Sequence, residues 1–166
     1  MTMHEKSIEL LNKAVGDELT AVHQYMYWHF HCDDQGYDLL AELFKRTAIE
    51  EMNHVEKLAE RILFLKGDVD MTLNDPVKNE KDVEKMLKMA AEMEQTSARD
   101  YNGWAIECAQ NADSQSKQLF EELVADEERH FDQYDIELEN LSRFGKDYLV
   151  LQSIERARTR GSQTSE

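Results

Sequence analysis

The sequence EEMNH, residues 50–54, lies within a longer stretch, LLAELFKRTAIEEMNHVEKLAERILFL, that covers residues 39–65. Glu51 and His54 fall inside an apolar stripe, so a carboxylate and an imidazole are predicted to point into a core, where each needs a partner. The apolar residues of this stripe recur at three- and four-residue steps, which indicates the buried face of a helix: Phe44, Ala48, Val55, Leu58 and Ile62.

The composition excludes several classes of protein. A chain of 166 residues with one proline and six glycines is expected to form one domain and lacks the turn residues of an all-β fold. A net charge of −16 argues against nucleic-acid binding through a basic surface. No apolar run approaches the ~20 residues of a membrane span, and the N-terminus MTMHEKSIELL does not resemble a secretory signal. Two cysteines without a CxxC motif add to the expectation of a cytoplasmic protein.

The predicted fold is an all-α four-helix bundle with a short fifth helix. The first and second helices, and the third and fourth, are joined by short connections and should form antiparallel hairpins. The connection at residues 67–82 could reach ~50 Å, enough to run the length of the bundle and make the second and third helices parallel. One long crossover of this kind is the ferritin-like connectivity. The helices are predicted at 5–34, 38–66, 82–111, 115–143 and 146–157, in a domain of residues 1–158 followed by a flexible polar tail, 159–166.

An internal repeat relates the two hairpins. When the chain is shifted by 76 residues, both tryptophans align, Trp28 with Trp104, and both cysteines align, Cys32 with Cys108. Because each of these residue types occurs only twice in the chain, chance is a poor explanation. The same shift pairs polar residues of the predicted inner faces: Glu18 with Glu94, Tyr25 with Tyr101, Glu51 with Glu127, and His54 with His130.

The repeat directs the same polar set into the bundle from both halves. The inward positions of the first helix are predicted to be Leu11, Val15, Glu18, Val22, Tyr25, His29 and Cys32. The first and third helices thus each supply a Glu, and the second and fourth helices each supply a Glu-x-x-His. Residues i and i+3 share one helix face, so each Glu-x-x-His converges on one point. The predicted set is Glu18, Glu51, His54, Glu94, Glu127 and His130.

Four buried carboxylates require compensation, since an isolated buried carboxylate would take up a proton. Two divalent metal ions would neutralise four carboxylates, and the two histidines give one nitrogen ligand to each. Oxygen and imidazole ligands without thiolate suit iron, manganese or zinc. One Glu on each of two helices and a Glu-x-x-His on each of the others is the ligand pattern of di-iron carboxylate bundles.

Three segments carry a resemblance to the bacterioferritin family, and together with the fifth helix it covers nearly the whole chain. The resemblance implies a 24-subunit hollow shell, built from dimers, that oxidises Fe(II) with O₂ or H₂O₂ and stores ferric mineral. It also implies that Glu51 and Glu127 bridge the two irons, and it leads us to expect a ferredoxin-type reductant for iron release. The segments are GDELTAVHQYMYW, IEEMNHVEKLAERILFLKG and LVADEERHFDQYDIELE.

Two positions bear on further iron and haem sites. Met52 matches the axial ligand of a haem b that the family shares between two subunits, and it should face away from the di-iron site. Met26 and Lys45 stand where the family usually has aromatic residues. Arg46 and Glu50 stand where some members have a His and an Asp on the inner surface of the shell. Because arginine is no metal ligand, that auxiliary site should be absent or altered, and Glu50 is interpreted as a solvated carboxylate.

The remaining polar core residues have less specific roles. Tyr25 and Tyr101 lie two turns beyond Glu18 and Glu94, and they could orient ligand carboxylates by hydrogen bonds or supply an electron. Cys32 and Cys108 lie roughly 21 Å beyond the same glutamates, too far to bind these metals.

Three functions fit these features. The first is an iron-storage ferroxidase, which the resemblance and the fifth helix favour. The second is a di-metal redox enzyme on the same bundle, such as a peroxidase or catalase of the rubrerythrin or manganese type. The third is a structural module without metal, which the four buried glutamates argue against.

Overall fold

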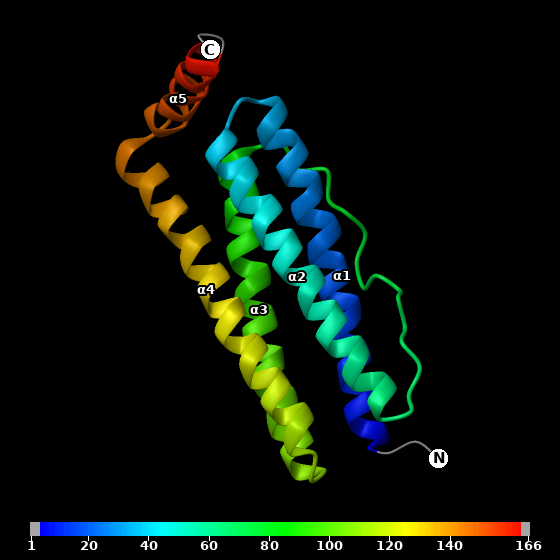
Figure 1. Ribbon diagram of the computed structural model, residues 1–166. Coiled ribbons are helices and arrows are strands. Elements are labelled where there is room, and N and C mark those ends of the chain that lie inside the picture. Colours follow the sequence, from blue (N-terminus) through cyan, green and yellow to red (C-terminus); the bar gives the residue numbers. More distant parts are fainter. Residues whose placement is uncertain (1–3, 164–166) are drawn as a thin grey trace.

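The computed structural model describes residues 4–163, which form five α-helices and no strand within that range (Figure 1). The predicted all-α bundle with a fifth helix is confirmed. The helix bounds agree with the prediction to within two residues, except at the end of the last helix. The helices are α1 (Glu5–Asp34), α2 (Asp38–Phe64), α3 (Val83–Gln110), α4 (Ser114–Phe144) and α5 (Asp147–Gln163).

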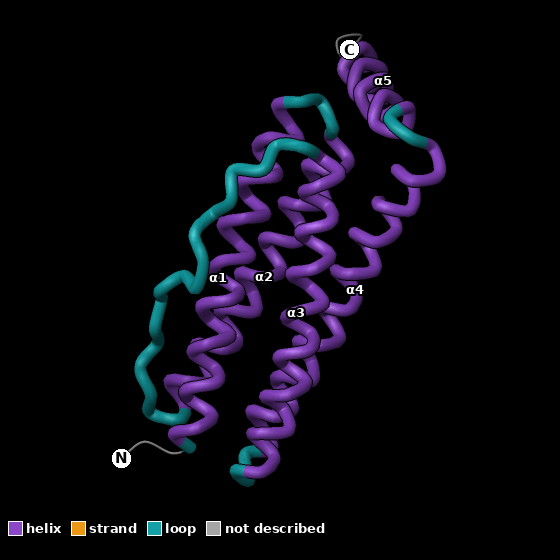
Figure 2. Tube along the Cα trace, turned by 180° about the vertical axis from the view of Figure 1, so that it is seen from behind, coloured by secondary structure: helices purple, strands orange, loops and turns teal. Residues whose placement is uncertain are grey.

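The helices pair in the predicted order. Helices α1 and α2 form one antiparallel hairpin, and α3 and α4 form the other. The crossover at residues 65–82 runs along the outside of α1 from one end of the bundle to the other, so that α2 and α3 point the same way (Figures 1 and 2). This arrangement brings the two sequence repeats face to face and places equivalent residues across a pseudo-twofold axis.

Hydrogen bonds from α1 hold the crossover in place. The Thr20 hydroxyl accepts from the backbone N–H of Asn74 at 3.0 Å, and the Gln24 side chain bonds both the N–H and the carbonyl of Lys78, at 2.8 and 3.1 Å. Asn74 also approaches α1 closely at Gly16, where an added Cβ would lie 2.4 Å from its Oδ1 atom. A side chain at position 16 would therefore displace the Asn74 side chain from its place against the helix.

The core consists of two apolar clusters, one towards each end of the bundle. One cluster contains Trp28, Phe44 and Tyr134, and the other contains Leu58 and Phe120. The polar residues of the repeat lie between the two clusters, so water has little access to them.

Two predicted inward positions on α1 are wrong. The structure buries Ala21 and Trp28, while Val22 and His29 are only partly buried. The predicted stripe advances by alternating steps of four and three residues, and at these two points the buried residue is the one just before the predicted position. His29 instead bonds the Ala41 carbonyl through Nδ1 at 2.7 Å.

Helix α5 is longer than predicted and continues to Gln163. Arg156 ties it to the α1–α2 turn, donating to the Asp33 carbonyl at 2.7 Å and pairing with Asp38 at 3.2 Å. Of the predicted tail, residues 159–163 are thus helical and 164–166 lie outside the described residues. Within residues 4–163, none of the helices combines the length and apolar character that crossing a membrane requires.

Candidate metal centre

The structure brings the six predicted ligands together in the middle of the bundle. Each of the four long helices contributes from its inner face, and α2 and α4 contribute their Glu and His from consecutive turns. All six side chains are buried, with exposed fractions between 0% and 2%: Glu18, Glu51, His54, Glu94, Glu127 and His130.

The six residues form two overlapping groups of possible ligand atoms, each within 4.8 Å of one another. Glu51 and Glu127 belong to both groups, as residues that bridge two metal ions would. The Nδ1 atom of His54 lies 2.9 Å from Glu51 and 3.3 Å from Glu127, and the two imidazole centroids are 6.1 Å apart. One group adds Glu18 and His54 to the shared pair, and the other adds Glu94 and His130.

Several donor atoms at this centre face only one another and have no hydrogen-bond partner among the described residues. A buried polar atom without a hydrogen bond is destabilising by about 1–3 kcal/mol, so a cluster of them calls for a ligand. Carboxylate oxygens and imidazole nitrogens are the donors that iron and manganese accept, and the residues therefore fit a pair of such ions. Atoms with no hydrogen-bond partner among the described residues include Glu51 Oε2, His54 Nδ1, Glu94 Oε2, Glu127 Oε1 and His130 Nδ1.

In the metal-free cluster, buried carboxyl groups retain protons, and this limits the buried negative charge. Burial, together with the negative charge of Glu18, raises the pKa of the Glu51 and Glu127 carboxyls well above their usual range. Burial would also raise the pKa of Glu18, but its close contacts with Glu51 and with His54 Nδ1, which lies 3.4 Å away, outweigh burial and lower that pKa to about 2. Two divalent cations would take the place of these protons.

Two carboxylates outside the cluster, one beside each histidine, orient the imidazoles. Asp126 Oδ2 lies 2.9 Å from His54 Nε2, and Glu50 Oε2 lies 2.7 Å from His130 Nε2. An Nε2–H that donates to a carboxylate leaves the Nδ1 lone pair free to bind a metal. Arg129 in turn bonds both carboxylates.

Glu50 is therefore not the solvated carboxylate that was predicted, because it contacts His130, one of the six predicted ligands. The repeat contained a signal for it, since the shift of 76 residues pairs Glu50 with Asp126, both acidic. Arg46 is exposed.

Glu50→Ala should weaken metal binding 10- to 100-fold, the usual effect of removing a carboxylate that orients a histidine ligand. Glu50→Gln keeps an oxygen that accepts from Nε2–H, so it should recover most of the affinity. Zn(II) competition with a chromophoric chelator measures the effect, with Glu42→Ala on the exposed side of α2 as the control. Equal affinities in Glu50→Ala and Glu42→Ala would show that Glu50 does not orient His130.

Each of the two tyrosines of the repeat bonds the glutamate of the opposite half. The Tyr101 hydroxyl donates to Glu18 Oε1 at 2.6 Å, and the Tyr25 hydroxyl donates to Glu94. Both rings are fully buried. Of the two roles predicted for Tyr25 and Tyr101, the structure thus shows the first, which is hydrogen bonding to carboxylates of the centre.

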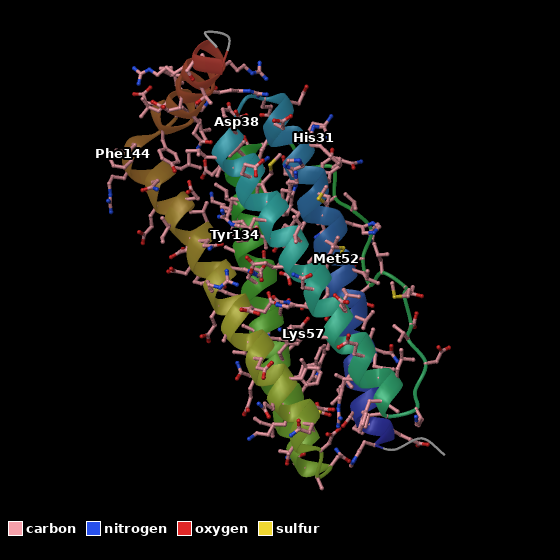
Figure 3. All side chains as sticks on the ribbon, in the orientation of Figure 1. His31, Asp38, Met52, Lys57, Tyr134 and Phe144 are labelled. Carbon is pink, nitrogen blue, oxygen red and sulfur yellow. The ribbon has the colours of Figure 1, made fainter. Side chains whose placement is uncertain are left out.

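Met52 lies outside the centre, on the outward side of α2 (Figure 3). Its side chain is 54% exposed, and Ile49 and Leu63 are also exposed on that helix. Cys32 and Cys108 are buried free thiols in the apolar clusters, and burial raises the pKa of Cys32 to about 12.

Comparisons with known proteins agree with this geometry. The ferritin-like domain family matches residues 8–144. The bacterioferritin of Brucella melitensis is 36% identical over 142 residues, which cover 86% of this chain and 88% of the relative. The bacterioferritin of Desulfovibrio desulfuricans is 34% identical, with coverages of 87% and 81%. A crystal structure of Desulfovibrio desulfuricans bacterioferritin that describes its diiron site superposes with a TM-score of 0.87 at 33% identity, covering 89% of this chain and 86% of that one.

Proposed function

This chain belongs to the bacterioferritin family, and from that premise we propose that it is an iron-storage ferroxidase. It takes up Fe(II) in pairs, passes their electrons to O₂ or H₂O₂, and stores the ferric product in a hollow shell of 24 subunits built from dimers. The observation that carries the proposal is the pair of buried donor groups that share Glu51 and Glu127, in which five donor atoms have no hydrogen-bond partner among the described residues.

The residues of the centre divide into three roles under this proposal. Glu51 and Glu127 bridge the two iron positions, and each position adds one imidazole and one further glutamate. Asp126 and Glu50 hold the imidazoles so that Nδ1 points inward. Tyr25 and Tyr101 orient the terminal glutamates. A bound iron pair supplies the two electrons that reduce the oxidant.

Met52 is proposed as one axial ligand of a haem b shared with a second subunit. The support is its thioether on an exposed apolar face together with Ile49 and Leu63. Haem added to the wild-type protein should show the absorption spectrum of bis-methionine ligation, and Met52→Leu should lose it. An unchanged spectrum in Met52→Leu would assign the haem to another site.

Storage is separated from the alternative, a di-metal redox enzyme, by how much iron the protein takes up. Aerobic addition of Fe(II) in increments should load far more iron than two per chain, and the iron should elute with the protein shell on a sizing column. Uptake that stops at two irons per chain, in a protein that elutes as a dimer, would favour the redox enzyme.

A further inference from the structure

Arg129 lies on α4 beside His130, and its guanidinium reaches both of the carboxylates that orient the imidazoles. Its Nη1 donates to Glu50 Oε1 at 3.5 Å, and its Nη2 donates to Glu50 Oε2 and, at 3.3 Å, to Asp126 Oδ1. Two parallel N–H···O bonds to one carboxylate fix its plane as well as its position. The same cation thus holds Glu50 across the gap between α2 and α4, and Asp126 within α4.

The hydrogen bonds continue from Arg129 to the metal centre along two branches. Glu50 Oε2, which accepts from Arg129, lies 2.7 Å from His130 Nε2. Asp126 Oδ2 lies 2.9 Å from His54 Nε2. Each imidazole therefore has a carboxylate behind it, and both carboxylates have the same guanidinium behind them. A change at Arg129 reaches both candidate nitrogen ligands, although Arg129 contacts neither metal position.

The two orienting carboxylates lie beside an open pocket, where packing does not hold them on all sides. Glu50 and Asp126 belong to the lining of this pocket of about 440 Å³, and their side chains are 29% and 35% exposed. A side chain beside water keeps rotamer freedom, which opposes any fixed hydrogen bond that it makes. An isolated exposed ion pair contributes little, but bidentate geometry and a network of several charges are the conditions under which such a pair matters.

The internal repeat shows that this anchor occurs on one side of the centre. The shift of 76 residues pairs Arg129 with Asn53, an exposed neutral residue that lines the same pocket. No hydrogen bond joins the Asn53 side chain to Glu50 or Asp126 among the residues that the structure describes. Arg129 also bonds both oxygens of Glu50 but only one of Asp126. The imidazole that Glu50 orients therefore depends on Arg129 more than the other imidazole does.

We propose that Arg129 is a positioning residue of the metal centre, which fixes Glu50 so that His130 presents Nδ1 to the metal. Its bond to Asp126 supports the other half to a lesser extent. The inference rests on the proposed metal centre and adds to it a residue that touches neither metal nor oxidant. The charge of Arg129 repels metal cations, so charge alone would weaken their binding, whereas positioning strengthens it. Because the two effects have opposite signs, removing Arg129 distinguishes them.

The test is the Zn(II) affinity of the assembled metal-free protein, measured by competition with a chromophoric chelator. Arg129→Ala should weaken binding about 10-fold, the lower end of the range for removing a carboxylate that orients a histidine ligand. Arg129→Lys keeps the charge but cannot form two parallel bonds, so its binding should also be weaker than wild type. The matched control, Lys57→Ala, removes an exposed positive charge from the same pocket and should not weaken binding.

A double-mutant cycle tests whether Arg129 acts through Glu50. Arg129→Ala combined with Glu50→Ala should weaken binding about as much as Glu50→Ala alone, because the residue that Arg129 holds is already missing. Fold-losses that multiply in the double variant would overturn the inference.

Wild-type or tighter binding in Arg129→Ala would also overturn the inference, as would full affinity in Arg129→Lys or an equal loss in Lys57→Ala. Circular dichroism should show that each variant folds. A wild-type protein that binds no Zn(II) would instead overturn the metal centre itself, and with it the proposed function.

Discussion

Glu127→Ala should lower the rate of Fe(II) oxidation by at least about 100-fold, the upper limit for losing a residue that only orients a ligand. The reason is that Glu127 belongs to both groups of donor atoms, so its removal damages both metal positions at once. The rate is measured by absorbance after O₂ is added to protein loaded with two Fe(II) per chain.

The neighbouring Glu128→Ala is a sharp control for this variant. Glu128 is exposed, lies one residue along α4 and carries the same charge. Circular dichroism and a sizing column should show that both variants fold and assemble. Oxidation at the wild-type rate in Glu127→Ala would rule out Glu127 as a bridging ligand.

Metal loading should stabilise the fold by more than about 5 kcal/mol. A ligand at 100 times its dissociation constant adds about 2.7 kcal/mol per site to the free energy of unfolding, and two sites double this. The measurement is urea unfolding at fixed protein concentration, with Zn(II) or with a chelator. Identical midpoints in the two conditions would contradict the proposed pair of sites.

The metal-free protein should also lose stability as the pH rises above about 4.5, the usual value for glutamate. The pKa values of Glu51 and Glu127 are raised, so the folded state holds protons that the unfolded state has already released. The raised pKa values of His54 and His130 act in the same direction above about 6.5. Glu18, with its pKa lowered to about 2, gives an opposite effect that is confined to pH values below this range. A metal-free protein that is more stable at pH 9 than at pH 6 would contradict this assignment.

The sequence was sufficient to predict the cluster of candidate ligands because each member repeats a pattern. Glu51 and His54 interrupt an apolar helix face, and the shift of 76 residues finds the equivalent pair on the fourth helix. Together with the single long crossover, these patterns also predicted the bundle, while the family was predicted from the resemblance of three segments; the bundle and the family are both confirmed.

Features that depend on contacts between helices could not be predicted in this way. Glu50 and Asp126 occupy partly exposed positions, where acidic residues are usually solvated, and only the distance between α2 and α4 shows that each bonds an imidazole of the other helix. The hydrogen bonds that hold the crossover against α1 depend on where residues 65–82 lie, and that segment has no periodicity to reveal it. The end of α5 was missed because its last turns carry polar residues instead of an apolar stripe.

An anaerobic titration of the metal-free protein with Fe(II) tests the di-iron centre most directly. Bound and free Fe(II) are separated, and the bound iron is counted per chain. The six-ligand centre predicts a sharp break at two Fe(II) per chain, as expected for two groups of donors that share two carboxylates. A break at one Fe(II) per chain, or bound iron that rises without any break, would contradict the six-ligand centre.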